Sequence, residues 1–141
     1  MATTRTATTT WDGGLAQGTG TTSVGSGTFG PVSVSWPRRT EDPQGATSPE
    51  ELIAAAHASC YAMALSHELG QAGGTDIHLE ISAAVSFDPT ASPPITGSAL
   101  TVSGSATGID AAGFREKAEA AKAGCPVSQA LAGANITLTV Q

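Results

Sequence analysis

One long, alanine-rich segment with a clear start signal constrains the fold of this chain more than any other feature. Ser48 precedes Pro49 and two glutamates, and a mostly apolar run follows from Leu52 to Leu65. Serine is favoured just before a helix, proline fits the first helical position, and Glu51 is placed to close a capping box. The pattern predicts a helix from Ser48 to a stop near Gly70.

The surface of this helix predicts a partner. Its side chains are apolar or small almost all round, which is typical of a helix that is buried on more than one side. Large apolar residues are scarce elsewhere, because Leu, Ile, Val and Phe together make up only 24 of the 141 residues. Alanine buries little area, so this core is thin against the entropy of the chain. We therefore expect an obligate or near-obligate homodimer.

Short segments rich in β-branched residues and glycine precede the helix. Three strands are expected there, with Asp12-Gly13-Gly14 as a hairpin turn, at 5–11, 16–24 and 29–35. Residues 36–47 are the most charged stretch and are predicted to form a surface loop.

The second half of the chain returns to strands. Two long strands, at 77–87 and 95–107, are expected to pair as a hairpin, and the first places alternate apolar residues on one face. A helix capped by Asp110, a short helical turn and a last strand should follow, at 111–123, 126–131 and 135–140. The order predicts an α+β fold with a largely antiparallel sheet, in a single domain that spans residues 1–141.

Charge and hydropathy exclude several classes of partner. The formal net charge is −6, with six Lys and Arg against twelve Asp and Glu, which disfavours nucleic acid. The longest mostly apolar run contains His57 and Ser59 and is too short to cross a bilayer. The N-terminus is rich in threonine and has no apolar stretch of a secretory signal. We expect a cytoplasmic protein with no membrane partner.

Two cysteines are the strongest candidates for chemistry. Cys60 lies in the apolar helix, and Cys125 lies just before Pro126. Their number alone leaves three possibilities open: buried small side chains, a redox pair or metal ligands. Pro126 favours a new helical turn, so Cys125 is a candidate N-cap whose thiolate would face backbone N–H groups. A buried Cys60 would have a raised pKa and would need a cation nearby, so Cys125 ranks as the more acidic thiol.

Other candidate side chains are weaker. His57 shares a helix face with Cys60 and has the chemistry of a base, but a hydrogen-bonded core histidine is the better interpretation. Tyr61 and Met63 are expected in the core or in a pocket wall, while His67 and His78 stand alone. The spacing of a zinc motif is missing, and we expect neither a metal nor a cofactor.

The segments around the two cysteines resemble the OsmC/Ohr family of osmotically inducible and organic hydroperoxide resistance proteins. The matching stretches read SPEELIAAAHASC at 48–60 and AKAGCPVS at 121–128, and their wording is closer to the OsmC branch. The length, the order of strands and helices, and the turn at Trp11-Asp12-Gly13 also fit, so the resemblance covers nearly the whole chain. It implies an α+β fold with a long buried central helix and an intertwined homodimer.

The resemblance also implies an activity, a thiol-dependent peroxidase that reduces organic hydroperoxides and, more weakly, hydrogen peroxide. Cys60 would be oxidised to a sulfenic acid, and Cys125 would resolve it to a disulfide. Arg39 would stabilise the Cys60 thiolate, with Arg38 as the alternative because this loop is one residue longer than the family's usual form. Glu50 would hold the guanidinium. The reductant would be a thiol or a lipoyl-type dithiol, and no cofactor is implied.

The spacing of Glu50 and Cys60 predicts a site shared between two chains. The two residues are ten positions apart on one helix, which corresponds to a rise of about 15 Å. Glu50 is therefore too far to serve the Cys60 of its own chain, even through an arginine. An antiparallel twin helix would bring Glu50 of one chain toward Cys60 of the other.

Two rival functions use the same residues. One is a non-enzymatic stress-response protein that binds a hydrophobic ligand in the same cleft, since a fold does not fix an activity. The other is a redox sensor that turns over slowly. The presence of both cysteines with an arginine and a glutamate favours the enzyme.

Overall fold

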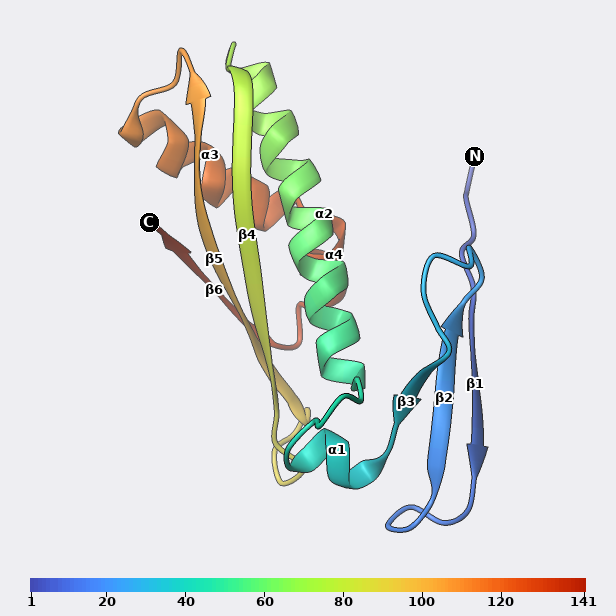
Figure 1. The fold of residues 1–141 in the computed structure, drawn as a ribbon. Helices are drawn as coiled ribbons and strands as arrows, with labels where there is room; N and C mark the ends of the chain where they lie inside the picture. Colours follow the sequence, from blue (N-terminus) through green and yellow to red (C-terminus); the bar gives the residue numbers. More distant parts are fainter. The chain divides into compact units, whose positions relative to one another are not determined.

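The computed structural model describes residues 1–141 and divides into two compact units, Met1–Leu52 and Ile53–Gln141. The α+β class predicted from the sequence is confirmed (Figure 1). None of the helices is both long enough and apolar enough to span a membrane. The elements in chain order are β1 (Ala7–Asp12), β2 (Thr19–Val24), β3 (Val32–Val34), α1 (Trp36–Thr40), α2 (Pro49–Gln71), β4 (Thr75–Phe87), β5 (Ile95–Thr107), α3 (Ala111–Gly124), α4 (Pro126–Ala130) and β6 (Asn135–Val140).

The first unit is built on an antiparallel sheet in the order β1-β2-β3. Cross-strand threonine pairs reinforce it, with Oγ1–Oγ1 distances of 2.8 Å for Thr9 and Thr22 and 3.1 Å for Thr10 and Thr21. The predicted strands are present, although each is shorter than its sequence pattern. The loop between β1 and β2 covers residues 13–18, which is longer than the predicted turn, and Gly13 adopts a φ of 98°.

A short helix, α1, occupies part of the segment that was predicted to be a loop. Ser35 caps it by accepting a hydrogen bond from the Arg38 backbone N–H at 3.3 Å, and Pro37 lies in its first turn. The prediction of a surface loop is therefore wrong for residues 36–40, which are helical. A helix of five residues is too short to produce a periodic pattern, but the serine and proline at its start are the same signal that marks α2.

The start of α2 agrees with the sequence prediction in all but one bond. The Ser48 hydroxyl accepts a hydrogen bond from the Glu51 backbone N–H at 3.1 Å. The Glu51 carboxylate accepts from the Thr47 hydroxyl at 2.8 Å, where a capping box would place the backbone N–H of Ser48. Glu51 therefore serves the start of the helix through Thr47, and not through a capping box.

Removing this cap should lower the stability of the protein. Ser48→Ala leaves the Glu51 N–H without its side-chain acceptor, so the free energy of unfolding should fall by about 1 kcal/mol. The measurement is urea denaturation at fixed protein concentration. Ser66→Ala is the matched control, because Ser66 lies exposed on the same helix, and its stability should stay within about 0.5 kcal/mol of wild type. Equal stability of Ser48→Ala and wild type would contradict the capping role.

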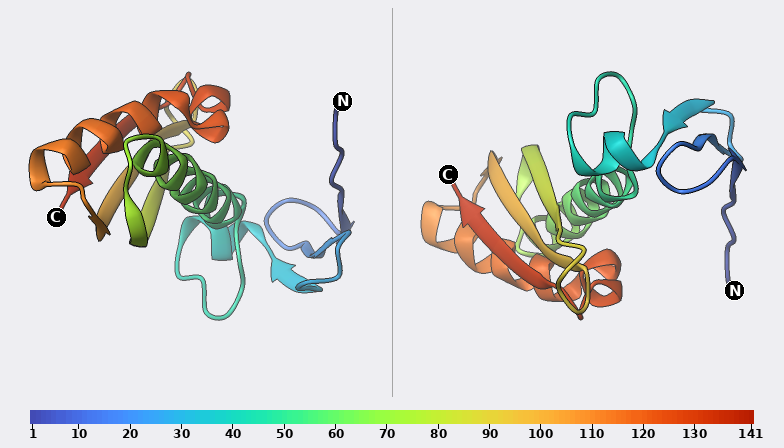
Figure 2. Two further views of the ribbon diagram at one scale, coloured as in Figure 1. Left: turned by 90° about the horizontal axis from the view of Figure 1, so that it is seen from above. Right: turned by 90° about the horizontal axis from the view of Figure 1, so that it is seen from below.

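The second unit contains a three-stranded sheet in the order β4-β5-β6. β4 and β5 form the predicted antiparallel hairpin, whereas β6 runs parallel to β5 because α3 and α4 carry the chain back across the sheet (Figures 1 and 2). The predicted alternation on β4 is confirmed, since every second residue from Ile77 to Phe87 is partly buried and those between are exposed.

The core of the second unit lies between one face of this sheet and the helices α2 and α3. From α2 it receives Tyr61, Leu65 and Leu69, each with no exposed surface. The opposite side of α2 is exposed and carries small or apolar side chains, among them Ala55, Ala56, Ser59 and Met63. Met63 is 73% exposed, so its predicted place in the core or a pocket wall is wrong within this chain. The second buried face that the sequence predicts for this helix is not covered by the other elements of the second unit.

Candidate active site

Arg39 and Glu50 form a tight ion pair in the first unit. The guanidinium Nη2 lies 2.7 Å from Glu50 Oε1, and Nε donates to the two carboxylate oxygens at 3.1 and 3.2 Å. Glu50 is nearly buried, with 7% of its surface exposed, and Arg39 also lies over the Trp36 ring at 5.9 Å from its centroid. A forked, charge-assisted contact of this kind fixes the guanidinium plane. α1 and the first turn of α2 supply the two side chains.

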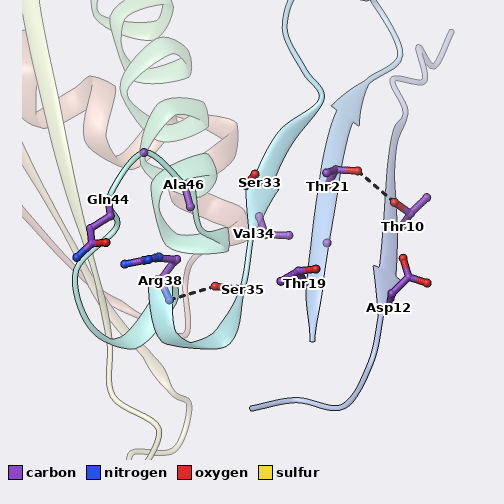
Figure 3. Close-up of a pocket in the computed structure, with 12 residues that line it drawn as sticks. Thr10, Asp12, Thr19, Thr21, Ser33, Val34, Ser35, Arg38, Gln44 and Ala46 are labelled. Carbon is purple, nitrogen blue, oxygen red and sulfur yellow. Dashed lines mark hydrogen bonds between the residues drawn. The ribbon is translucent and has the colours of Figure 1, made fainter. Parts of the chain in front are cut away.

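The neighbouring Arg38 lies in different surroundings. It lines a polar pocket of about 610 Å³ with Thr10, Asp12 and Thr21 (Figure 3), and its Nη1 donates to the Asp42 carbonyl at 3.3 Å. Arg39 lines a second pocket in this unit, to which β1 contributes Thr9 and Trp11. Alternate residues of a strand point to opposite faces. The two arginines therefore serve opposite faces of the sheet, and only Arg39 meets a carboxylate.

The pocket beside Arg39 is mostly apolar. It has a volume of about 500 Å³, and Trp11, Leu15, Trp36 and Leu52 are among the side chains that line it. Trp11 faces Gly20 across the β1–β2 pair, where a side-chain carbon would lie only 2.8 Å from the indole ring. Glycine at this place on β2 lets the ring lie against the strand. An apolar cavity with one fixed cation suits a ligand that has a greasy part and an electron-rich polar end.

The second unit brings the two cysteines together. Both are free thiols; Cys60 on α2 is half-buried, and Cys125, between α3 and α4, has no exposed surface. Their side chains are in hydrogen-bond contact. No local spacing in the sequence joins these positions. The contact arises because α3 packs on the middle of α2, where Tyr61 Oη donates to the Ala118 carbonyl at 2.9 Å.

The two thiols differ in acidity. Burial raises the pKa of Cys60, and the neighbouring Cys125 adds to this, while a hydrogen bond from the Val127 N–H opposes it. Burial would also raise the pKa of Cys125, but hydrogen bonds from the backbone of Ser128, from Cys60 and from the Ser128 hydroxyl outweigh it, so this pKa is lowered. Cys125 occupies the N-cap position of α4, as predicted, but its side chain makes no hydrogen bond with the geometry of a helix cap. The ranking of the thiols derived from the sequence agrees with these directions.

His57 is buried one turn before Cys60 and has two partners. Its Nδ1 lies 2.7 Å from Ser98 Oγ on β5, and its Nε2 lies 2.8 Å from Ser128 Oγ on α4. Burial lowers the pKa of this imidazole, so the ring is neutral at neutral pH. The sequence predicted a hydrogen-bonded core histidine but gave no sign of the two serines, which are 41 and 71 positions away.

The remaining histidines lie apart from this cluster. His67 and His78 are both exposed. No group of three or more His, Cys, Asp or Glu side chains is arranged to hold a metal ion.

Comparison with known proteins places these residues in a family. The family model described as "OsmC-like protein" matches residues 41–141, which include both cysteines and Glu50. The chain is 46% identical over 132 residues to "Peroxiredoxin OsmC" of Escherichia coli strain K12, covering 93% of this chain and 91% of that protein.

Solved structures have the same fold. The organic hydroperoxide resistance protein OhrB of Bacillus subtilis superposes with a TM-score of 0.71 at 28% identity, over 96% of this chain and 98% of that one. A structure from Legionella pneumophila, described as organic hydroperoxide resistance protein OsmC, gives 0.73 at 26% identity, over 96% of both chains. The family match and the 46% identity together show that this chain belongs to the OsmC family of proteins, as its cysteine motifs predicted.

Proposed function

We propose that this chain is a cysteine-based peroxidase that reduces organic hydroperoxides through a Cys60 sulfenic acid and a Cys60–Cys125 disulfide. The observation that carries the proposal is the contact between the two free thiols, one half-buried and one fully buried. The names of the relatives, peroxiredoxin and organic hydroperoxide resistance protein, support the reaction class. Such a pair suits a cycle in which one sulfur attacks and the other resolves.

The chemistry proceeds in two balanced steps. The Cys60 thiolate attacks one oxygen of the hydroperoxide, the oxygen–oxygen bond breaks, and the alkoxide leaves as an alcohol after taking up a proton. Cys60 is then a sulfenic acid. The Cys125 sulfur attacks the Cys60 sulfur, forms the disulfide and releases water. A thiol or a lipoyl-type dithiol returns both cysteines to the reduced state by exchange.

The first step needs a cation beside Cys60, because burial raises the pKa of this thiol. We assign this role to Arg39, with Glu50 fixing the guanidinium plane through the forked ion pair. The spacing of ten positions from Glu50 to Cys60 on α2 supports a composite site in a homodimer, with Arg39 and Glu50 from one subunit and Cys60 from the other. The uncovered face of α2, with its alanines and Met63, supports a second chain at this helix.

The apolar pocket beside Arg39 supports an organic substrate over hydrogen peroxide. Trp11, Leu15 and Leu52 would contact an alkyl or aryl tail, and Arg39 would bind the peroxide oxygens. We propose that the whole chain works as one OsmC-like domain in the cytoplasm, with no metal and no cofactor in the cycle.

A direct assay tests this proposal. Purified protein with a dithiol should consume cumene hydroperoxide with a higher kcat/KM than hydrogen peroxide, because only the former fills the apolar pocket. One equivalent of peroxide, added without the dithiol, should lower the intact mass by two hydrogen atoms, as expected for a disulfide. Unchanged mass and no peroxide consumption would reject the enzyme and favour a ligand-binding protein. Disulfide formation without turnover by any dithiol would instead indicate a redox sensor.

A further inference from the structure

The proposed cycle does not name the group that carries the Cys125 thiol proton to the released water. Cys125 must lose its thiol proton when it attacks the Cys60 sulfenic acid, yet this side chain has no exposed surface. Water and solvent bases therefore cannot collect the proton directly. A buried base close to Cys125 would speed the step by taking up this proton as the sulfur attacks.

A hydrogen-bonded path leads from Cys125 to an unprotonated base. The Ser128 hydroxyl forms a hydrogen bond with the Cys125 sulfur, and the same Oγ lies 2.8 Å from His57 Nε2. On the other side of the ring, Nδ1 lies 2.7 Å from Ser98 Oγ. A neutral imidazole has one N–H group, so one nitrogen donates and the other accepts. The Ser128 hydroxyl has one hydrogen, which points either to the Cys125 thiolate or, when Cys125 is a protonated thiol, to His57 Nε2. In the second arrangement the ring carries its hydrogen on Nδ1 and donates to Ser98.

The surroundings of His57 leave it available for this role. β5 and α4, which supply the two serines, carry no titratable side chain. The titratable groups that neighbour the ring on α2 are Cys60 and Tyr61, and burial raises the pKa of both. No carboxylate holds the ring as an imidazolium, and burial lowers its own pKa. His57 is therefore a neutral base whose nearest exchangeable protons come from two hydroxyl groups.

We propose that His57 is a positioning residue for the resolving cysteine. The imidazole takes up the Cys125 proton through Ser128 as the disulfide forms. This inference rests on the proposed peroxidase function and deepens it. The thiol proton moves to Ser128 Oγ while the Ser128 hydroxyl proton moves to His57 Nε2. The Cys125 sulfur then bonds to the Cys60 sulfur, and the sulfur–oxygen bond of the sulfenic acid breaks. The released hydroxide and the proton that His57 gives up together make water.

A single-turnover experiment separates this role from a structural one. Reduced protein is mixed with one equivalent of cumene hydroperoxide, and the Cys60 sulfenic acid is trapped with a dione reagent at timed intervals and read by intact mass. In His57→Gln and Ser128→Ala, the first step should keep its wild-type rate. The second step should slow by about 10²-fold or more, as expected when a general base is lost. Its rate should continue to rise at alkaline pH, where the wild-type rate has levelled off.

Ser98→Ala is the matched comparison. It removes a hydrogen bond of the same kind from the same ring, but it leaves the path from His57 through Ser128 to Cys125 intact. Its stability loss in urea should equal that of Ser128→Ala, while disulfide formation should stay within about threefold of wild type. Ser128→Ala removes one oxygen atom, so the path is tested even if His57→Gln does not fold.

Three results would overturn the inference. Resolution at the wild-type rate and pH profile in Ser128→Ala would show that the path carries no proton. Equal slowing in Ser98→Ala and Ser128→Ala would show that the ring serves packing alone. Faster resolution in His57→Gln would show that the ring opposes the step. In each of these cases wild-type protein still forms a disulfide, whereas failure of the proposed function itself would show as wild-type protein that forms none.

Discussion

Cys60→Ser is expected to abolish hydroperoxide turnover, with kcat/KM falling by more than about 10³-fold. A serine hydroxyl keeps the shape of the side chain but cannot become a thiolate near neutral pH, and it has no stable oxidised form equivalent to a sulfenic acid. Cys125 cannot replace it, since that sulfur has no exposed surface for a substrate to reach. The measurement is steady-state consumption of cumene hydroperoxide with a dithiol.

Cys125→Ser should behave differently from Cys60→Ser. The first equivalent of peroxide should still react at close to the wild-type rate, because the attacking sulfur is intact. The protein should then gain one oxygen atom in mass and stop, since no second thiol converts the sulfenic acid to a disulfide. If Cys125→Ser were inert and Cys60→Ser accumulated the extra oxygen, the two roles would be exchanged, as the lower pKa of Cys125 would then explain.

Arg39→Gln is expected to lower kcat/KM by about 10²- to 10³-fold, the usual cost of losing one fixed donor to a developing charge. The Cys60 thiol would lose the cation that opposes burial, so its pKa would rise further. A group with a raised pKa holds its proton to higher pH. The rate of Cys60 alkylation by iodoacetamide should therefore begin to rise at a higher pH in the variant than in wild type.

Arg38→Gln provides the control for the charge itself. It removes the same side chain from the adjacent position, but Arg38 faces the polar pocket and has only a backbone carbonyl as its partner (Figure 3). Its kcat/KM and alkylation profile should stay within about threefold of wild type. Equal losses in both variants would contradict the assignment of Arg39. A large loss in Arg38→Gln alone would transfer the role to Arg38.

Subunit exchange provides a test of the proposed composite site. Mixing Arg39→Gln protein with Cys60→Ser protein under conditions that allow subunit exchange tests the composite site. A mixed dimer with complementary sites would contain one intact Cys60 facing one intact Arg39–Glu50 pair. Activity should therefore rise toward half of wild type in the half of the dimers that are mixed. Absence of any recovery with proven exchange would place the whole site within one chain.

The sequence by itself determined most of the elements and identified the candidate reactive groups. The start of α2 follows from the serine, proline and glutamate at its N-terminus, since capping and proline geometry act over only a few residues. The long hairpin follows from period-two alternation on β4. The two cysteine motifs marked Cys60, Cys125 and Glu50 as candidates, and the family resemblance pointed to Arg39 with Arg38 as the alternative.

The tertiary structure decided what the local patterns could not. The helix α1 was missed because five residues carry no period, and β6 joined the sheet in parallel because of how α3 crosses it. The proposal of Arg39 over Arg38 rests on the face of the sheet that each side chain meets, which the sequence does not reveal. The partners of His57 lie on β5 and α4, far along the chain, and a sequence holds no record of such pairings. Secondary structure depends mainly on neighbouring residues. The pKa values of the thiols and the hydrogen bonds of His57 depend on groups that only folding brings together.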